Sequence, residues 1–245
     1  MRRLLTVLLI VLNSSLFAQL PDGNEILKKI DNNMTSDTKV VTSKMVIHGR
    51  RGSRTVVSKS YIEGVDKSYT EYLSPPREKG TKMLKLEDQL WTYSPKTDRT
   101  IRISGHMLRQ SVMGSDLSYE DMMEDPKLHN LYEAKIIDEG THDGRECWIL
   151  ELTAKRENSA YHSRKLWVDK KRYLALKENR YARSGKLLKS AEISDVQRQD
   201  NRWVPMKMVF KDELKRGKGT EFIIDTIKFN IPIQNHIFTK AMLRR

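Results

Sequence analysis

Most of the chain alternates between apolar and polar residues with a period of two, the pattern of β-strands that bury one face. In the segment 206–211, Met206, Met208 and Phe210 alternate with residues that include two lysines. Pro205, just before this run, indicates a strand start or an edge strand. Runs of this kind, separated by turn residues, predict strands at 41–47, 54–63, 66–73, 83–87, 89–94, 99–104, 131–139, 146–155, 164–169, 173–182, 186–199, 206–211 and 223–229.

These runs follow one another without a βαβ pattern, so we expect antiparallel pairing. The predicted fold is mainly β with some α-helix: a single highly curved antiparallel sheet of about eleven or twelve strands, with one apolar face and one wet face. No internal repeat or low-complexity linker indicates a second domain.

Two segments depart from the strand pattern and are predicted to be helical. Residues 22–34 carry apolar residues at helical spacing, with Asp22 or Asn24 as the candidate N-cap. Residues 105–131, called the insert below, are rich in methionine and lie between two predicted strands. We expect both segments to cover the apolar face of the sheet, and the tail from residue 235 to form a short helix or an extended cap.

The insert contains a sequence pattern typical of a helix N-terminus. Ser118 followed by Asp121 fits a capping box, in which the two side chains satisfy free N–H groups. We therefore interpret Glu120, Asp121 and Glu124 as residues that favour a helix N-terminus, in preference to acid–base catalysts. Gly114 permits a positive φ. The methionines have two interpretations, core packing or adaptable contacts with several hydrophobic ligands.

The beginning of the chain has the pattern of a secretory signal peptide. Arg2 and Arg3 precede an apolar run at 4–12, and small residues lead up to Ala18. We therefore predict a signal peptide at residues 1–18 that is cleaved after Ala18, a mature domain at 19–245, and export of the protein. The apolar run is too short for a membrane span. With no cysteine near the predicted cleavage site, a lipid anchor on the protein is not expected.

The chain is basic, with 45 Lys and Arg against 32 Asp and Glu and a formal net charge of +13. Such an excess favours anionic partners, which for an exported protein are lipid headgroups in preference to nucleic acid. No nucleic-acid-binding motif is present. A basic surface that is simply solvated is an equally good interpretation. The single cysteine, Cys147, cannot form an intramolecular disulfide and is expected to be buried in a strand.

Sequence signatures of enzymes are mostly missing. The six histidines show no metal-binding spacing, and neither a Gly-x-Ser-x-Gly elbow nor a phosphate-binding loop occurs. We therefore expect a protein that is not an enzyme and that needs no cofactor and no metal. A lipid hydrolase whose triad is assembled from distant residues stays open as an alternative, because triads are defined by geometry and not by order in the sequence.

Four segments together resemble a known family. They are Tyr-Leu-Ser-Pro-Pro at 72–76 with Lys-Gly-Thr at 79–81, Leu-Trp-Thr-Tyr-Ser-Pro at 90–95 with Arg-Thr-Ile-Arg-Ile at 99–103, Met-Gly-Ser-Asp-Leu-Ser-Tyr-Glu-Asp at 113–121, and Ile-Phe-Thr-Lys at 237–240. In this order they resemble the LolA-like outer-membrane lipoprotein-sorting proteins over most of the mature chain. The resemblance implies an unclosed β-barrel with helices over a hydrophobic cavity.

On this basis we predict a monomeric periplasmic carrier that binds acyl chains of lipoproteins or lipids and delivers them to the outer membrane. Its expected partners are a membrane-protein donor or acceptor and, peripherally, the membrane. The alternatives are an envelope sensor or adaptor with the same fold and, less favoured, a secreted lipid hydrolase. Arg102 and Arg109 are candidates for contacts with the insert or with anionic headgroups, although ordinary surface arginines are the favoured interpretation of both. The candidate ligand and lid residues are all apolar: Met45, Ile47, Leu84, Leu86, Trp91, Ile101, Ile103, Met107, Met113, Leu117, Met122, Met123, Trp148, Leu150, Met206 and Met208.

Overall fold

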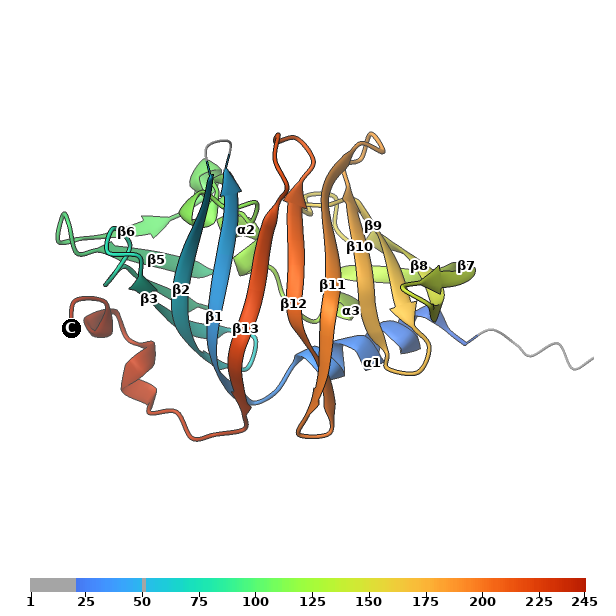
Figure 1. The fold of residues 1–245 in the computed structure, drawn as a ribbon, viewed down its shortest axis with the longest axis horizontal. Helices are drawn as coiled ribbons and strands as arrows, with labels where there is room; N and C mark the ends of the chain where they lie inside the picture. Colours follow the sequence, from blue (N-terminus) through green and yellow to red (C-terminus); the bar gives the residue numbers. More distant parts are fainter. Residues whose placement is uncertain (1–20, 50–51) are drawn as a thin grey trace, which may run out of the picture.

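The protein is built on one open antiparallel sheet of 13 strands (Figure 1). The computed structural model describes residues 21–49 and 52–245, and the predicted signal peptide at residues 1–18 lies outside them. The strands are β1 (Thr38–Gly49), β2 (Gly52–Glu63), β3 (Lys67–Ser74), β4 (Lys82–Leu86), β5 (Gln89–Ser94), β6 (Arg99–Ile103), β7 (Tyr132–His142), β8 (Arg145–Ala154), β9 (Ser163–Asp169), β10 (Leu174–Tyr181), β11 (Leu187–Gln199), β12 (Arg202–Asp212) and β13 (Thr220–Phe229).

The strand order is β6-β5-β4-β3-β2-β1-β13-β12-β11-β10-β9-β8-β7. Neighbouring strands are consecutive in the sequence everywhere except at β1 and β13. This pair joins an N-terminal meander, β1 to β6, to a C-terminal meander, β7 to β13. The two free edges are therefore β6 and β7, and the insert connects them along the chain. The predicted antiparallel, unclosed sheet is confirmed. Each of the 13 predicted ranges corresponds to one strand, so the overall estimate of about eleven or twelve strands is slightly too low.

The sequence suggested that Pro205 marks a strand start or an edge strand, and this prediction is wrong. Pro205 lies inside β12, a central strand. The physical reason is that β12 pairs with β13 only from Lys207 to Phe210, so the preceding residues of β12 have no strand partner on that side within the part of the chain that the structure describes. A residue without an N–H group is tolerated at such a local edge.

Helix α1 (Gly23–Met34) covers one face of the C-terminal meander, which we call the inner face. Its predicted cap is confirmed, since the Asp22 carboxylate accepts a hydrogen bond from the Asn24 N–H at 2.9 Å. The Asn24 side chain in turn accepts from the Ala134 N–H at the edge of the sheet. A side chain at Gly23 would lie 2.5 Å from the Ala134 carbonyl, so only glycine permits this close approach.

The insert covers the inner face of the N-terminal meander, and the C-terminal tail covers the outer face of the same strands. The tail forms two short 3₁₀ helices, η3 (Asn235–Phe238) and η4 (Lys240–Leu243). Phe238 and Leu243 are buried against Leu84 and Trp91. The neighbouring residues Met83 and Leu90 pack instead with the insert, as the alternation of side chains in a strand requires.

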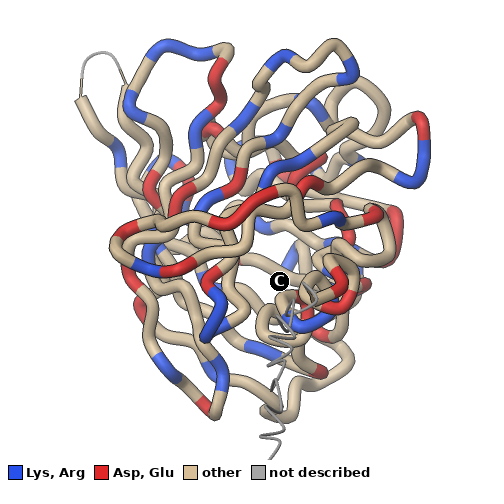
Figure 2. Tube along the Cα trace, turned by 90° about the vertical axis from the view of Figure 1, so that its right-hand side faces the viewer, with Lys and Arg blue, Asp and Glu red and all other residues tan. Residues whose placement is uncertain are grey.

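The charges on the molecule are mixed. Figure 2 shows that the positions of Lys and Arg are distributed over many strands and loops, as are those of Asp and Glu. Cys147 is buried in β8, as expected. Within residues 21–49 and 52–245, no helix is long and apolar enough to cross a membrane.

Candidate ligand-binding site under the insert

The insert consists of four short helical turns: η1 (Gly105–Arg109), η2 (Val112–Gly114), α2 (Tyr119–Met123) and α3 (Leu128–Leu131). The predicted capping box is confirmed. The Ser118 hydroxyl accepts a hydrogen bond from the Asp121 N–H at 3.2 Å, and the Asp121 carboxylate accepts from the Ser118 N–H at 2.7 Å. Gly114 has the expected positive φ. Because α2 has only five residues, contacts with the sheet must determine its position.

Two cations of the N-terminal meander bind backbone carbonyls of the insert. Arg54 on β2 donates to the Met113 carbonyl and pairs with Glu78 at 2.7 Å. Lys85 on β4 is buried and donates to the Met123 carbonyl at 3.3 Å, at the end of α2. The sequence had suggested Arg102 and Arg109 for such contacts. Both are exposed, and neither forms an ion pair or side-chain hydrogen bond within the described part of the chain.

Three cations of the C-terminal meander form a second attachment. Lys189, Arg180 and Arg164 lie in register on the adjacent strands β11, β10 and β9, since Arg180 pairs with Lys189 on one side and with Arg164 on the other. We call these three residues the cationic row. Like charges directly opposite one another in a sheet are destabilising, so the row requires anionic partners.

Those partners are Glu178 from the sheet and two carboxylates from the insert. Asp121 binds Arg180 at 3.0 Å and also binds Lys189. Glu124 binds Arg164, whose side chain is only 1% exposed. Glu178 lies between the two arginines, 2.6 Å from Arg164 and 2.9 Å from Arg180. Three carboxylates thus neutralise three cations, and this buried network fixes α2 to the sheet.

The network shifts the pKa values of its acids. Burial alone would raise the pKa of Asp121, but the charges of Arg180 and Lys189 outweigh it and hold that pKa well below its usual range. Burial likewise opposes ionisation of Glu178, yet Arg180 and Arg164 lower its pKa from 4.5 to about 2. Both carboxylates are therefore ionised at neutral pH, which supports capping and attachment as the role of Asp121.

The lowered pKa of Glu178 predicts a dependence of stability on pH. A depressed pKa in the folded state stabilises the protein above the unfolded pKa, and this contribution is lost as the pH falls from 4.5 toward 2. We expect the difference in free energy of unfolding between the wild type and Glu178→Gln to shrink over that range, as measured by urea denaturation. The exposed Glu25→Gln serves as the control. A difference for Glu178→Gln that stays constant would contradict this assignment.

A row of apolar residues crosses the inner face beside the insert. Val56, Met45, Phe222, Met208 and Ile193 are successive cross-strand partners on β2, β1, β13, β12 and β11. We call these five residues the apolar ladder. Val56 and Met45 are buried against the insert. The other three remain partly exposed, although they belong to central strands. The ladder is thus an apolar track that neither α1 nor the insert covers completely.

Two of the predicted ligand residues, Met45 and Met208, belong to this ladder. Several others pack together under the insert or within it, namely Ile47, Ile103, Met107, Met113, Leu117 and Met123. Val56, Phe222 and Ile193 were not among the predicted residues. Phe222 was missed because a bulge at Asp225 changes which residues of β13 face inward, and the pattern after 225 had been extended back to Ile223.

The remaining predicted ligand residues lie elsewhere. Leu84, Leu86 and Trp91 form the outer-face cluster under the C-terminal tail, so the structure separates them from the insert. Trp148 and Leu150 pack with α1, and Met206 packs with Phe229 at the local edge of β12. Ile101 and Met122 are 44% and 38% exposed.

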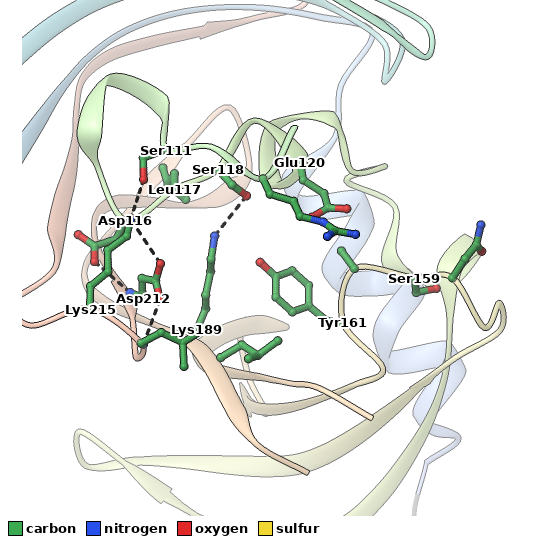
Figure 3. Close-up of a pocket in the computed structure, with 15 residues that line it drawn as sticks. Ser111, Asp116, Leu117, Ser118, Glu120, Ser159, Tyr161, Lys189, Asp212 and Lys215 are labelled. Carbon is green, nitrogen blue, oxygen red and sulfur yellow. Dashed lines mark hydrogen bonds and ion pairs between the residues drawn. The ribbon is translucent and has the colours of Figure 1, made fainter. Parts of the chain in front are cut away.

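A cavity of about 400 Å³ lies at one end of the site (Figure 3). It is bounded by the insert, the segment 158–161 and the turn after β12. Figure 3 shows Lys189 extending toward Ser118 with Tyr161 beside it. A second cavity, of about 360 Å³, lies over β10 to β12. Both are lined largely by polar and charged residues, so neither is the hydrophobic cavity that the resemblance implies. Of the predicted residues, only Leu117 and Arg109 line the first one.

Comparison with known proteins assigns the chain to a protein family. A protein-family model described as "Uncharacterized protein" matches residues 64–245, which is most of the sequence. The chain belongs to this family. No curated protein sequence matches it.

Solved structures define the fold more closely. A domain from Vibrio parahaemolyticus named for outer membrane lipoprotein sorting superposes with a TM-score of 0.79 at 24% identity, over 91% of this chain and 98% of that one. A DUF1329 family protein from Desulfovibrio piger gives 0.80 at 25% identity, over 90% and 97%. The LolA superfamily protein NE2245 from Nitrosomonas europaea gives 0.76 at 21% identity, over 91% and 100%. The family member described here therefore has a LolA-like fold, as its sequence predicted.

Proposed function

We propose that this protein is a periplasmic carrier that binds acyl chains of a lipoprotein or lipid on the apolar ladder and delivers them to the outer membrane. The observation that carries the proposal is the ladder itself, a partly exposed apolar track on the inner face of central strands. The LolA-like fold supports it, since one of the similar structures is named for lipoprotein sorting. Residues 19–245 would form the mature carrier domain.

The dimensions of the ladder suit a long acyl chain. Neighbouring strands lie about 4.8 Å apart, so five strands in register provide a track of about 19 Å. Each methylene buried there contributes about 0.8 kcal/mol. Binding would displace part of the insert, whose methionines can repack around chains of different shape. No covalent step is needed.

The insert is suited to open and close over this track. It connects the two free edges of the sheet, and no residue of α2 is buried as a whole, although the side chain of Asp121 is only 4% exposed. Hydrogen bonds from Arg54 and Lys85 and the ion pairs of the cationic row hold it in place. The side chains on the sheet that make these contacts could bind a ligand or a membrane partner in place of the insert, with little change in the sheet. Such binding would release the insert.

Native mass spectrometry and lipid extraction of the protein purified from its own envelope would test the proposal, together with uptake of a fluorescent fatty-acyl probe. We expect co-purified lipid or lipoprotein that is released only on denaturation, and saturable uptake of the probe by the delipidated protein. An empty protein that also fails to take up the probe would overturn the carrier assignment. The envelope adaptor would then be the better interpretation.

A further inference from the structure

The cationic row and the apolar ladder share one face and one strand. Lys189 and Ile193 are both on β11, four residues apart, and no bulge separates them in the pairing with β12. Their side chains therefore point to the same side of the sheet. At about 3.3 Å per residue, the row lies about 13 Å along the strand from the ladder. A ligand with an apolar chain and a charged end could contact both.

The row depends on the insert for most of its neutralisation. Of its three carboxylate partners only Glu178 belongs to the sheet, whereas Asp121 and Glu124 belong to the insert. When the insert moves away, three cations share a single carboxylate. Such a site would have a strong attraction for an anion, in a place where burial limits screening by salt.

The arginines also retain unused hydrogen-bond donors. The Nε atoms of Arg164 and Arg180 are buried and have no hydrogen-bond partner among residues 21–49 and 52–245. Buried donors are almost always satisfied, so two unsatisfied ones in the same row need an explanation. A guanidinium group uses its Nε together with a terminal nitrogen to bind a phosphate through two parallel hydrogen bonds.

We propose that the cationic row binds the phosphate of an anionic lipid headgroup, and that Asp121 and Glu124 occupy this site when no lipid is bound. This assignment rests on the proposed function, because the acyl chains of the same lipid would lie on the apolar ladder. The phosphate displaces the two carboxylates and thereby releases α2, so headgroup binding and opening of the insert are one event. The insert closes again when the lipid leaves.

The test compares three ligands of the full mature chain by isothermal titration calorimetry: dioleoylphosphatidic acid, dioleoylglycerol with the same acyl chains, and inorganic phosphate. We expect the wild type to bind phosphatidic acid at least about tenfold more tightly than dioleoylglycerol. Lys189→Met should abolish most of this preference, measured as the ratio of the two dissociation constants of the same variant.

The double variant Asp121→Asn with Glu124→Gln should change binding in the opposite direction. Because it removes the competing carboxylates, we expect it to bind phosphatidic acid about tenfold more tightly than the wild type. Glu120→Gln is the matched control: it makes the same change on the same helix, but Glu120 has no ion pair within the described residues. A role in attachment alone would not predict a gain in affinity for one headgroup.

The outcomes separate the two proposals. Equal affinity of the wild type for phosphatidic acid and dioleoylglycerol would overturn the phosphate site and leave the acyl-binding proposal intact. Failure to bind either lipid would overturn both. Tighter binding of inorganic phosphate than of phosphatidic acid would overturn the assignment to a lipid. Thermal unfolding shows whether the double variant folds. If it does not fold, the phosphate site is tested by comparing Lys189→Met with the wild type in their preference for phosphatidic acid over dioleoylglycerol.

Discussion

Replacing Arg164 with alanine is expected to destabilise the protein by about 3–5 kcal/mol. Its side chain is 1% exposed and binds both Glu124 and Glu178. The substitution would leave these carboxylates near one another with only Arg180 to neutralise Glu178, and it would remove the partner that joins the end of α2 to β9. The cost arises mainly from the unpaired buried charges and only in part from the lost contacts.

Urea denaturation followed by circular dichroism would measure the effect of Arg164→Ala, with Arg183→Ala as the control. Arg183 is 62% exposed and lies 3.9 Å from Glu157, an exposed pair that should contribute less than about 1 kcal/mol. A double variant that combines Arg164→Met with Glu124→Gln should recover much of the loss, because it leaves two cations, Arg180 and Lys189, with two carboxylates, Asp121 and Glu178. A loss for Arg164→Ala no larger than that of the control would contradict the network.

Local patterns in the sequence were sufficient to predict the strands and the capping box. The alternation in β1, where Val41, Met45 and Ile47 are buried, depends only on which side of a strand each residue faces. The capping box of Ser118 and Asp121 spans four residues and is a property of the helix start. Both are confirmed because no distant part of the chain is needed to specify them.

The cationic row could not be predicted in this way. Arg164 is 40 residues from Glu124, and Lys189 is 68 residues from Asp121, so only the folded sheet brings them together. Arg102 and Arg109 were chosen because they are close to the insert in sequence, yet the arginines that hold it come from β2, β9 and β10. Nearness along the chain was the wrong criterion for a segment that joins two distant edges.

Alternation also cannot tell which face of a sheet is the inner one. Leu84 and Trp91 have the pattern of buried residues, and they are buried, but by the C-terminal tail on the outer face. The sequence predicted a short helix or a cap from the tail but did not indicate which strands the tail would cover. Since both faces of β4 and β5 are covered, apolar residues occur in both registers there.

The apolar ladder can be tested by placing a charge in its centre. Met208→Asp should weaken binding of a fluorescent fatty-acyl probe by at least about 3 kcal/mol, which is roughly a hundredfold. Met208 is the cross-strand partner of both Phe222 and Ile193, so a carboxylate there would be desolvated by an acyl chain lying on the ladder. Because the side chain is partly exposed in the unliganded protein, the fold should tolerate the change.

Ile223→Asp is the matched control for Met208→Asp. Ile223 is also apolar and partly exposed, but it follows Phe222 and therefore faces the outer side, where its cross-strand partners are Lys44 and Lys207. An aspartate at this position lies between two cations and should leave both stability and probe binding close to those of the wild type. Thermal unfolding of the two variants separates a folding defect from a binding defect. If both variants bound the probe equally well, acyl chains would not lie on the inner face of these strands, and the ladder would have only a structural role.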